Sequence, residues 1–145
     1  MKHLILAGLL IWSGPAAADG LIHYKTDDSF DDVIFGLENA ILDEGLRVDD
    51  ISHVGEMLER TRQDVGSDVT VFAQADVYSF CSATLSRKVM EADPMNIRFC
   101  PYDIFVAVLP NSEETIIGYR SFPEGPMKEV EVLLDRIARS AVGLD

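Results

Sequence analysis

The chain has 145 residues and is strongly acidic, with 12 lysines and arginines, 25 aspartates and glutamates, and a formal net charge of −13 at pH 7. This charge argues against nucleic acid as a partner, because phosphate binding needs a basic surface, and it equally disfavours adsorption to anionic lipid. The apolar share of 48% is ordinary for a globular protein and argues against disorder. A chain of this length has room for one domain with one modest core.

The first residues have the pattern of a cleavable secretory signal. A weakly positive start is followed by the apolar run 4–12, and the alanines at 16–18 are the small residues that a signal peptidase requires. The run is too short for a bilayer span, which needs about 20 residues. A buried core helix and a retained membrane anchor are the alternatives. We expect residues 1–18 to be removed and residues 19–145 to act as one exported domain, periplasmic or secreted, without membrane contact.

The next part of the chain predicts a strand, a helix and a second strand. Residues 21–25 alternate between apolar and polar, which indicates a short strand. Ser29 is a typical N-cap for a helix with one apolar face, and Gly45 is suited to end that helix in a left-handed conformation. Residues 47–54 alternate again and predict a strand, with a bulge near 49–50.

The middle of the chain predicts a shorter helix and a further strand. Residues 56–64 are polar and helix-prone, and the Gly-Ser-Asp sequence at 66–68 breaks the helix. Residues 69–73 are ambiguous between strand and loop, and residues 77–81 indicate a strand.

The remaining chain predicts a helix, a hairpin and a last helix. The helix over 83–92 ends before Pro94, because the residue before a proline avoids helical geometry. The most apolar run, 102–109, predicts a central strand buried on both faces, and 116–120 returns as its hairpin partner. A helix with a continuous apolar face begins near Met127.

This order of elements favours an α+β fold over a doubly wound parallel sheet, because helices at both ends flank a sheet that contains at least one hairpin. We expect a mainly antiparallel sheet with helices packed on one face. The other face would then be free for a ligand or a second subunit.

Four short segments carry a family resemblance: FCSA at 80–83, SR at 86–87, EADP at 91–94 and FCPY at 99–102. Together with the helix that ends at Gly45, they resemble the domain of unknown function 302 family over about residues 23–142. The resemblance implies a small α+β domain similar to the TATA-box-binding-protein class, with helices on a curved antiparallel sheet, and a homodimer. It implies no established activity. Many members have a Pro-Cys pair before the apolar strand, whereas this chain has Cys100-Pro101, and no role is carried over to that position.

Cys81 and Cys100 are the only cysteines, and several interpretations of them stay open. A disulfide is the default in an exported domain and would stabilise it by about 3 kcal/mol. A redox-active or sulfur-handling thiol is the second interpretation, since Cys81 lies near a helix N-terminus, which lowers a thiol pKa. Arg87, about one turn later, is a possible ligand-binding residue that could stabilise a thiolate or hold an anion, and its alternative role is a solvated helix charge. The absence of a C-x-x-C motif weighs against it. The third is a soft metal site that adds some of three further residues, Met90, Met95 and His53. Two free buried thiols are the fourth.

Other candidate residues indicate binding more than catalysis. Four side chains are candidates for the uncovered sheet face, as ligand-binding residues or dimer contacts: Tyr78, Tyr102, Tyr119 and Arg120. His23 and His53 each fit a surface or hydrogen-bonded histidine. The sequence contains no nucleophile elbow, P-loop or zinc-protease motif.

The sequence therefore predicts an exported binding or interaction module of unknown ligand, without catalytic machinery, cofactor or metal. A homodimer is expected, and an unknown small ligand or protein is the further partner. The alternative function is a thiol-dependent periplasmic redox or sulfur-handling protein that uses Cys81 and Cys100.

Overall fold

The computed structural model describes residues 20–144, so the expected signal segment 1–18 lies outside the described residues. The elements follow in this order: β1 (Leu21–Thr26), α1 (Phe30–Asp43), β2 (Val48–Ser52), α2 (Val54–Thr61), β3 (Gln74–Phe80), α3 (Ala83–Ala92), the 3-10 helix η1 (Pro94–Phe99), β4 (Tyr102–Val108), β5 (Thr115–Arg120) and α4 (Met127–Ala141). None of these helices is long and apolar enough to cross a bilayer.

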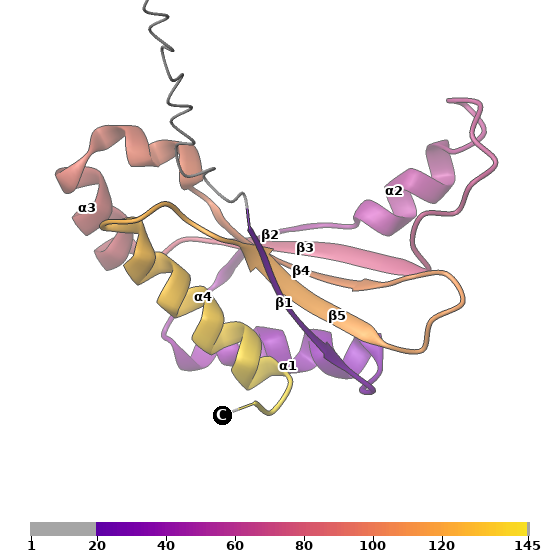
Figure 1. The fold of residues 1–145 in the computed structure, drawn as a ribbon, viewed down its shortest axis with the longest axis horizontal. Coiled ribbons are helices and arrows are strands. Elements are labelled where there is room, and N and C mark those ends of the chain that lie inside the picture. Colours follow the sequence, from indigo (N-terminus) through magenta and orange to yellow (C-terminus); the bar gives the residue numbers. More distant parts are fainter. Residues whose placement is uncertain (1–19, 145) are drawn as a thin grey trace, which may run out of the picture.

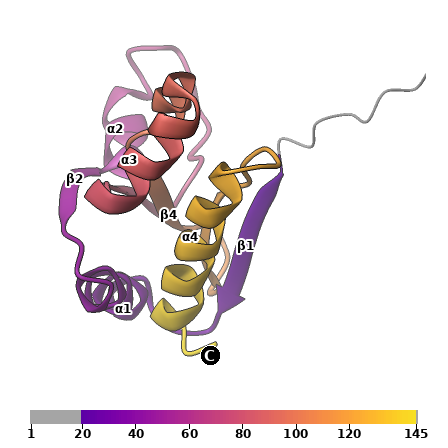
Figure 2. The same cartoon turned by 90° about the vertical axis from the view of Figure 1, so that its left-hand side faces the viewer.

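The strands form one five-stranded sheet in the order β1-β5-β4-β3-β2, and every neighbouring pair is antiparallel. The predicted α+β class with an antiparallel sheet is therefore confirmed. Helices α1 and α4 lie on the same side of the sheet, while α3 and α2 lie toward opposite ends of the strands (Figure 1). Viewed from the side, α4 runs beside α1 and below α3 (Figure 2). Helix α1 contacts α4, β4 and β5, and α2 packs against β3.

Local signals in the sequence explain how several elements begin and end. The Ser29 side chain accepts a hydrogen bond from the Asp32 backbone N–H at 3.2 Å and caps α1. Gly45 has a φ of 73° just after α1. The register of β2 against β3 shifts between Val48 and Asp50, which is the predicted bulge.

The core lies between the sheet and the pair α1 and α4. It is built from alternate residues of the central strands and the apolar faces of these helices, including Leu37, Ile41, Ile104, Ile117 and Leu134, which are all fully buried. Side chains alternate across a strand, so the neighbours of these strand residues point to the opposite face of the sheet. Phe105 and Arg120 are among the residues on that face.

The tyrosines expected on the uncovered face lie in the core instead. Tyr78, Tyr102 and Tyr119 are 3%, 1% and 1% exposed. The reason is the alternation, because Tyr102 and Tyr119 are each two residues from a core isoleucine and share its face. Arg120, the next residue after Tyr119, is exposed as expected.

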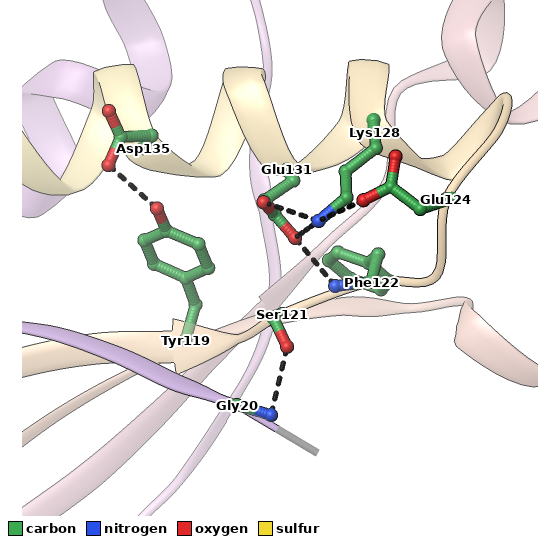
Figure 3. A network of polar contacts seen from close by, with 8 residues as sticks. All are labelled: Gly20, Tyr119, Ser121, Phe122, Glu124, Lys128, Glu131 and Asp135. Atoms are coloured by element: carbon green, nitrogen blue, oxygen red, sulfur yellow. Dashed lines mark hydrogen bonds and ion pairs between the residues drawn. The ribbon is translucent and has the colours of Figure 1, made fainter. Parts of the chain in front are cut away.

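Each of the two most buried tyrosines has a partner for its hydroxyl, which permits its burial. The Tyr102 hydroxyl lies 2.9 Å from Ser86 Oγ on α3. The Tyr119 hydroxyl donates to Asp135 Oδ1 on α4 at 2.7 Å (Figure 3), and the Tyr24 hydroxyl donates to the same oxygen. Burial and the hydrogen bond to Asp135 raise the pKa of Tyr119, which keeps this hydroxyl protonated as a donor.

A second polar contact fixes the chain between β5 and α4. Glu131 Oε2 accepts from the Phe122 backbone N–H at 2.6 Å and from Lys128 Nζ at 3.0 Å (Figure 3). The Gly20 backbone N–H donates to Ser121 Oγ at 2.9 Å, which joins the start of β1 to the end of β5. The chain from Ser121 to Phe122 is therefore held from both sides.

The structure decides one ambiguous segment and differs from the sequence prediction at two others. Residues 69–73, which were ambiguous, form no strand. The helix η1 was not predicted, and it is started by Asp93, whose side chain accepts from the Met95 backbone N–H. The central strand β4 is also not buried on both faces, because Phe105 is half-buried on the open side.

The closest approach of α1 to α4 gives a test of the packing. A Cβ placed on Gly36 would lie 2.3 Å from the Ala141 carbonyl oxygen, so the substitution Gly36→Ala must push the two helices apart. Alanine favours a helix over glycine by about 1 kcal/mol, yet we expect Gly36→Ala to lower the free energy of unfolding by about 1–3 kcal/mol. Urea unfolding followed by circular dichroism measures this. The control Asn39→Ala, at an exposed position of α1, should leave stability unchanged or raise it, and a stabilised Gly36→Ala would contradict the packing.

Candidate functional site

The sheet register brings the two cysteines together. Cys81 follows β3 and Cys100 precedes β4, and these strands pair at Phe80 and Tyr102. The two Sγ atoms lie 2.9 Å apart, both side chains are partly exposed, and both thiols are unbonded in this structure. The Cys100–Pro101 peptide bond is cis. The distance between the two sulfur atoms is thus less than 1 Å above the roughly 2.05 Å of a disulfide bond, and small side-chain rotations are enough to join them.

Electrostatics do not favour a thiolate at Cys81. The pKa of the Cys81 thiol is raised to about 12, and burial is the largest cause. Contact with Cys100 and the charge of Asp49 raise this pKa further, while a backbone hydrogen bond from Tyr102 lowers it. At the start of α3, the Ser82 hydroxyl accepts from the Leu85 backbone N–H, so this donor is taken by the cap. The low pKa considered from the sequence is therefore wrong for this environment.

The other residues considered around the thiols lie elsewhere. Arg87 is exposed and donates to Glu91 at 2.9 Å. His53 pairs with Asp76, several residues along β3 from Cys81. Within residues 20–144, no group of three or more histidine, cysteine, aspartate and glutamate side chains is placed to hold a metal ion.

The open face of the sheet contains a hollow of about 480 Å³. Seven residues line it: Gly20, Leu21, Val77, Asp103, Phe105, Tyr119 and Arg120. Phe105 pairs with Gly118 of β5, and a Cβ on that glycine would lie 2.8 Å from the Phe105 Cζ atom. The ring therefore lies across β5, in space that only a glycine leaves open.

Charges are divided across this open face. The register places Lys25 and Arg120, on β1 and β5, on one side of the Phe105 ring, where Lys25 is paired with Glu114 at 3.0 Å and Arg120 forms no ion pair within the described residues. Asp103 on β4 pairs with Ser79, which in turn pairs with Asp50 on β2, so the other side is acidic. The face thus has an apolar centre between a basic and an acidic half, and it is suited to bind a surface of matching pattern.

A second hollow, of about 710 Å³, lies between α1 and α2 and is lined in part by Ile34, His53, Glu56 and Asp76. His53 Nδ1 lies 2.9 Å from Asp76 Oδ1, and the aspartate side chain is 13% exposed against 56% for the histidine. This hydrogen bond, followed by the charge of Asp76, raises the pKa of His53. The pair connects the start of α2 to β3.

Sequence reasoning missed Phe105, Asp103 and the role of Gly118. The apolar run that contains Phe105 was read as buried on both faces, which hid the exposed side of the strand. A glycine opposite an aromatic residue in a predicted hairpin is the signal that could have found this pair.

No family model and no curated protein matches the chain. A solved structure does match: the crystal structure of the uncharacterized conserved protein DUF302 from Bacillus stearothermophilus, with a TM-score of 0.57 and 19% identity over 84% of this chain and 94% of that chain. The likeness expected from the short sequence segments is therefore confirmed at the level of the fold. At this identity the match shows a shared fold, and the function of the family is itself unknown.

We predict that Asp76→Asn lowers the pKa of His53 toward its ordinary value of about 6.5. Because folding raises the pKa of His53, the pair contributes its full stabilisation when the pH is below the ordinary histidine pKa. This stabilisation is lost as the pH rises through the raised pKa of the folded state. Titration of the imidazole Cε1–H signal by NMR measures the midpoint in both proteins. Glu56→Gln removes only a minor cause and should shift the midpoint less. An unchanged midpoint in Asp76→Asn would show that the pair does not form in solution.

Proposed function

We propose that the protein is an exported binding module that uses the open face of its sheet, and that a second copy of the chain binds at this face. Export is supported by the signal-like pattern of residues 1–18. Binding is supported above all by one observation, the hollow in which the half-buried Phe105 ring lies over Gly118 between charges of opposite sign.

The charge pattern favours a second copy because the face is complementary to itself. A two-fold rotation about an axis parallel to the strands places the basic half, with Lys25 and Arg120, over the acidic half, with Asp103 and Asp50, of the other copy. The apolar centre with Phe105 then meets its own equivalent. Such an isologous contact has an apolar core and a polar rim, as stable interfaces do.

Phe105→Glu tests this interface. It places a charge at the apolar centre, and we expect the dimer to dissociate at least about 30-fold more readily, as for an interface hot spot. Sedimentation equilibrium over a series of protein concentrations measures this. Phe35→Glu is the matched control, because Phe35 is 70% exposed on α1, away from the open face, and should leave the dimer intact. A wild-type protein that stays monomeric throughout the series would exclude this partner.

For the thiols we propose a structural disulfide between Cys81 and Cys100, supported by the Sγ–Sγ distance of 2.9 Å. The same distance favours a second candidate function, thiol-dependent redox or sulfur handling. The pKa of about 12 weighs against the second candidate, because the thiolate is the reactive form.

Alkylation separates the two candidates. In protein purified from the periplasm without reductant, we expect neither cysteine to react with iodoacetamide, as judged by intact mass. After reduction of the folded protein, Cys81 should react at least about 100-fold more slowly than free cysteine near pH 8, because the raised pKa leaves little thiolate. Rapid labelling of either cysteine before reduction would support the redox function instead. Unfolding in denaturant should make both thiols react quickly and serves as the control.

A further inference from the structure

We propose that a small hollow beside Cys100 binds a small tetrahedral oxyanion, of the sulfate or phosphate type. This hollow adjoins the one around Phe105 and shares Asp103 and Arg120 with it, but Phe105 does not line it, and the proposal does not require self-association. It assigns a ligand class to the edge of the sheet where the cysteines lie.

The hollow is small and lies where two distant segments meet. It has a volume of about 140 Å³. The residues that line it come from the η1–β4 connection and from the end of β5: Arg98, Phe99, Cys100, Pro101, Asp103, Arg120 and Phe122. A water takes about 30 Å³ in the liquid, so the hollow has room for about four or five groups of that size. A sulfate or phosphate ion has five non-hydrogen atoms.

The two arginines of the hollow lack carboxylate partners in a chain rich in carboxylates. Six basic residues of the described chain are in ion pairs: Lys25, Arg62, Arg87, Lys88, Lys128 and Arg136. Within residues 20–144, neither Arg98 nor Arg120 forms such a pair, although the whole chain has 25 acidic residues. The guanidinium groups are therefore available to an external anion, to which arginine binds well through paired N–H donors.

Arg98 is held in place by groups that leave part of its charge unsatisfied. Its Nη1 donates to the Met95 carbonyl oxygen at 2.9 Å, and its Cζ lies 4.4 Å from the centre of the Phe99 ring. The Phe99 ring in turn meets the Phe122 ring edge-on, with 5.5 Å between their centres. Neither the carbonyl nor the rings carry a full negative charge, so Arg98 is positioned without being neutralised.

The carboxylates near the hollow do not cancel its positive charge. Asp103 lines the hollow and keeps its negative charge, because the Ser79 hydroxyl that donates to it at 2.6 Å is neutral, but the lining also contains the two positive charges of Arg98 and Arg120. Glu131 approaches from α4, and its charge is paired with Lys128 while it accepts from the Phe122 backbone N–H. The hollow is thus a local positive site on an acidic protein, which favours a compact anion over a cation or an apolar ligand.

Calorimetric titration of the purified protein with sodium sulfate, and separately with sodium phosphate, tests the site, with ionic strength held constant by sodium chloride. We expect saturable binding with one anion per chain. Arg98→Gln and Arg120→Gln should each weaken it at least tenfold. Arg60→Gln is the matched control, because Arg60 also lacks an ion pair in the described chain but lies on α2, and it should bind as the wild type does.

The titrations distinguish a phosphate from a sulfur oxyanion as the ligand. They also distinguish failure of the anion site from failure of the proposed dimer. Binding of both anions identifies the site by charge and shape, and binding of only one identifies a phosphate or a sulfur oxyanion. Arg98→Gln is the decisive variant, because Arg98 lines this hollow and not the one around Phe105. Absence of saturable binding, or an equal loss in Arg60→Gln, would overturn the site. Sedimentation of the same samples shows independently whether the open face still forms a dimer.

Discussion

The packing of α1 and α4 against one face of the sheet decides which side chains of the central strands can take part in binding. The two helices approach closely at Gly36 and Ala141, and α4 is tied to β1 and β5 by Asp135, which accepts from Tyr24 and Tyr119. Once these tyrosines face the helices, the pleat of the strands forces the alternate residues to the other side. The open face is therefore a consequence of the core.

The same arrangement places the cysteines close to Arg98 and Arg120. The strands β3 and β4 set Cys81 opposite the η1–β4 connection, which carries Cys100 and, two residues earlier, Arg98. The end of β5 brings Arg120 and Phe122 to the same place. A bond between the thiols would join β3 directly to this connection, so it would be expected to steady the position of Arg98 as well.

Much of the backbone could be predicted from short-range signals, because caps and breaks act locally. Ser29, Gly45 and the bulge before Asp50 each sit where the sequence places them. The burial of Tyr102 and Tyr119 follows from the alternation along their strands, but their hydroxyl partners could not be predicted, because these lie on helices that the sequence does not pair with them. The hollow beside the two cysteines could not be predicted either, because it needs residues from η1 and β5 that only the folded sheet brings together.

Proteins that share this fold can differ in the ligands they bind, because ligand specificity depends on side chains that the core does not require. Arg98 and Arg120 contribute little to the buried apolar cluster, and both are exposed. In a chain with a net charge of −13, carboxylates outnumber guanidinium groups, yet several arginines of the described chain, among them Arg60, Arg98 and Arg120, form no ion pair. Arg98 is held instead by the Met95 carbonyl and the Phe99 ring, which carry no full negative charge. A cation kept apart from an excess of anionic side chains by neutral contacts retains its attraction for an anion from solution, and this is the physical basis for an oxyanion site on so acidic a protein.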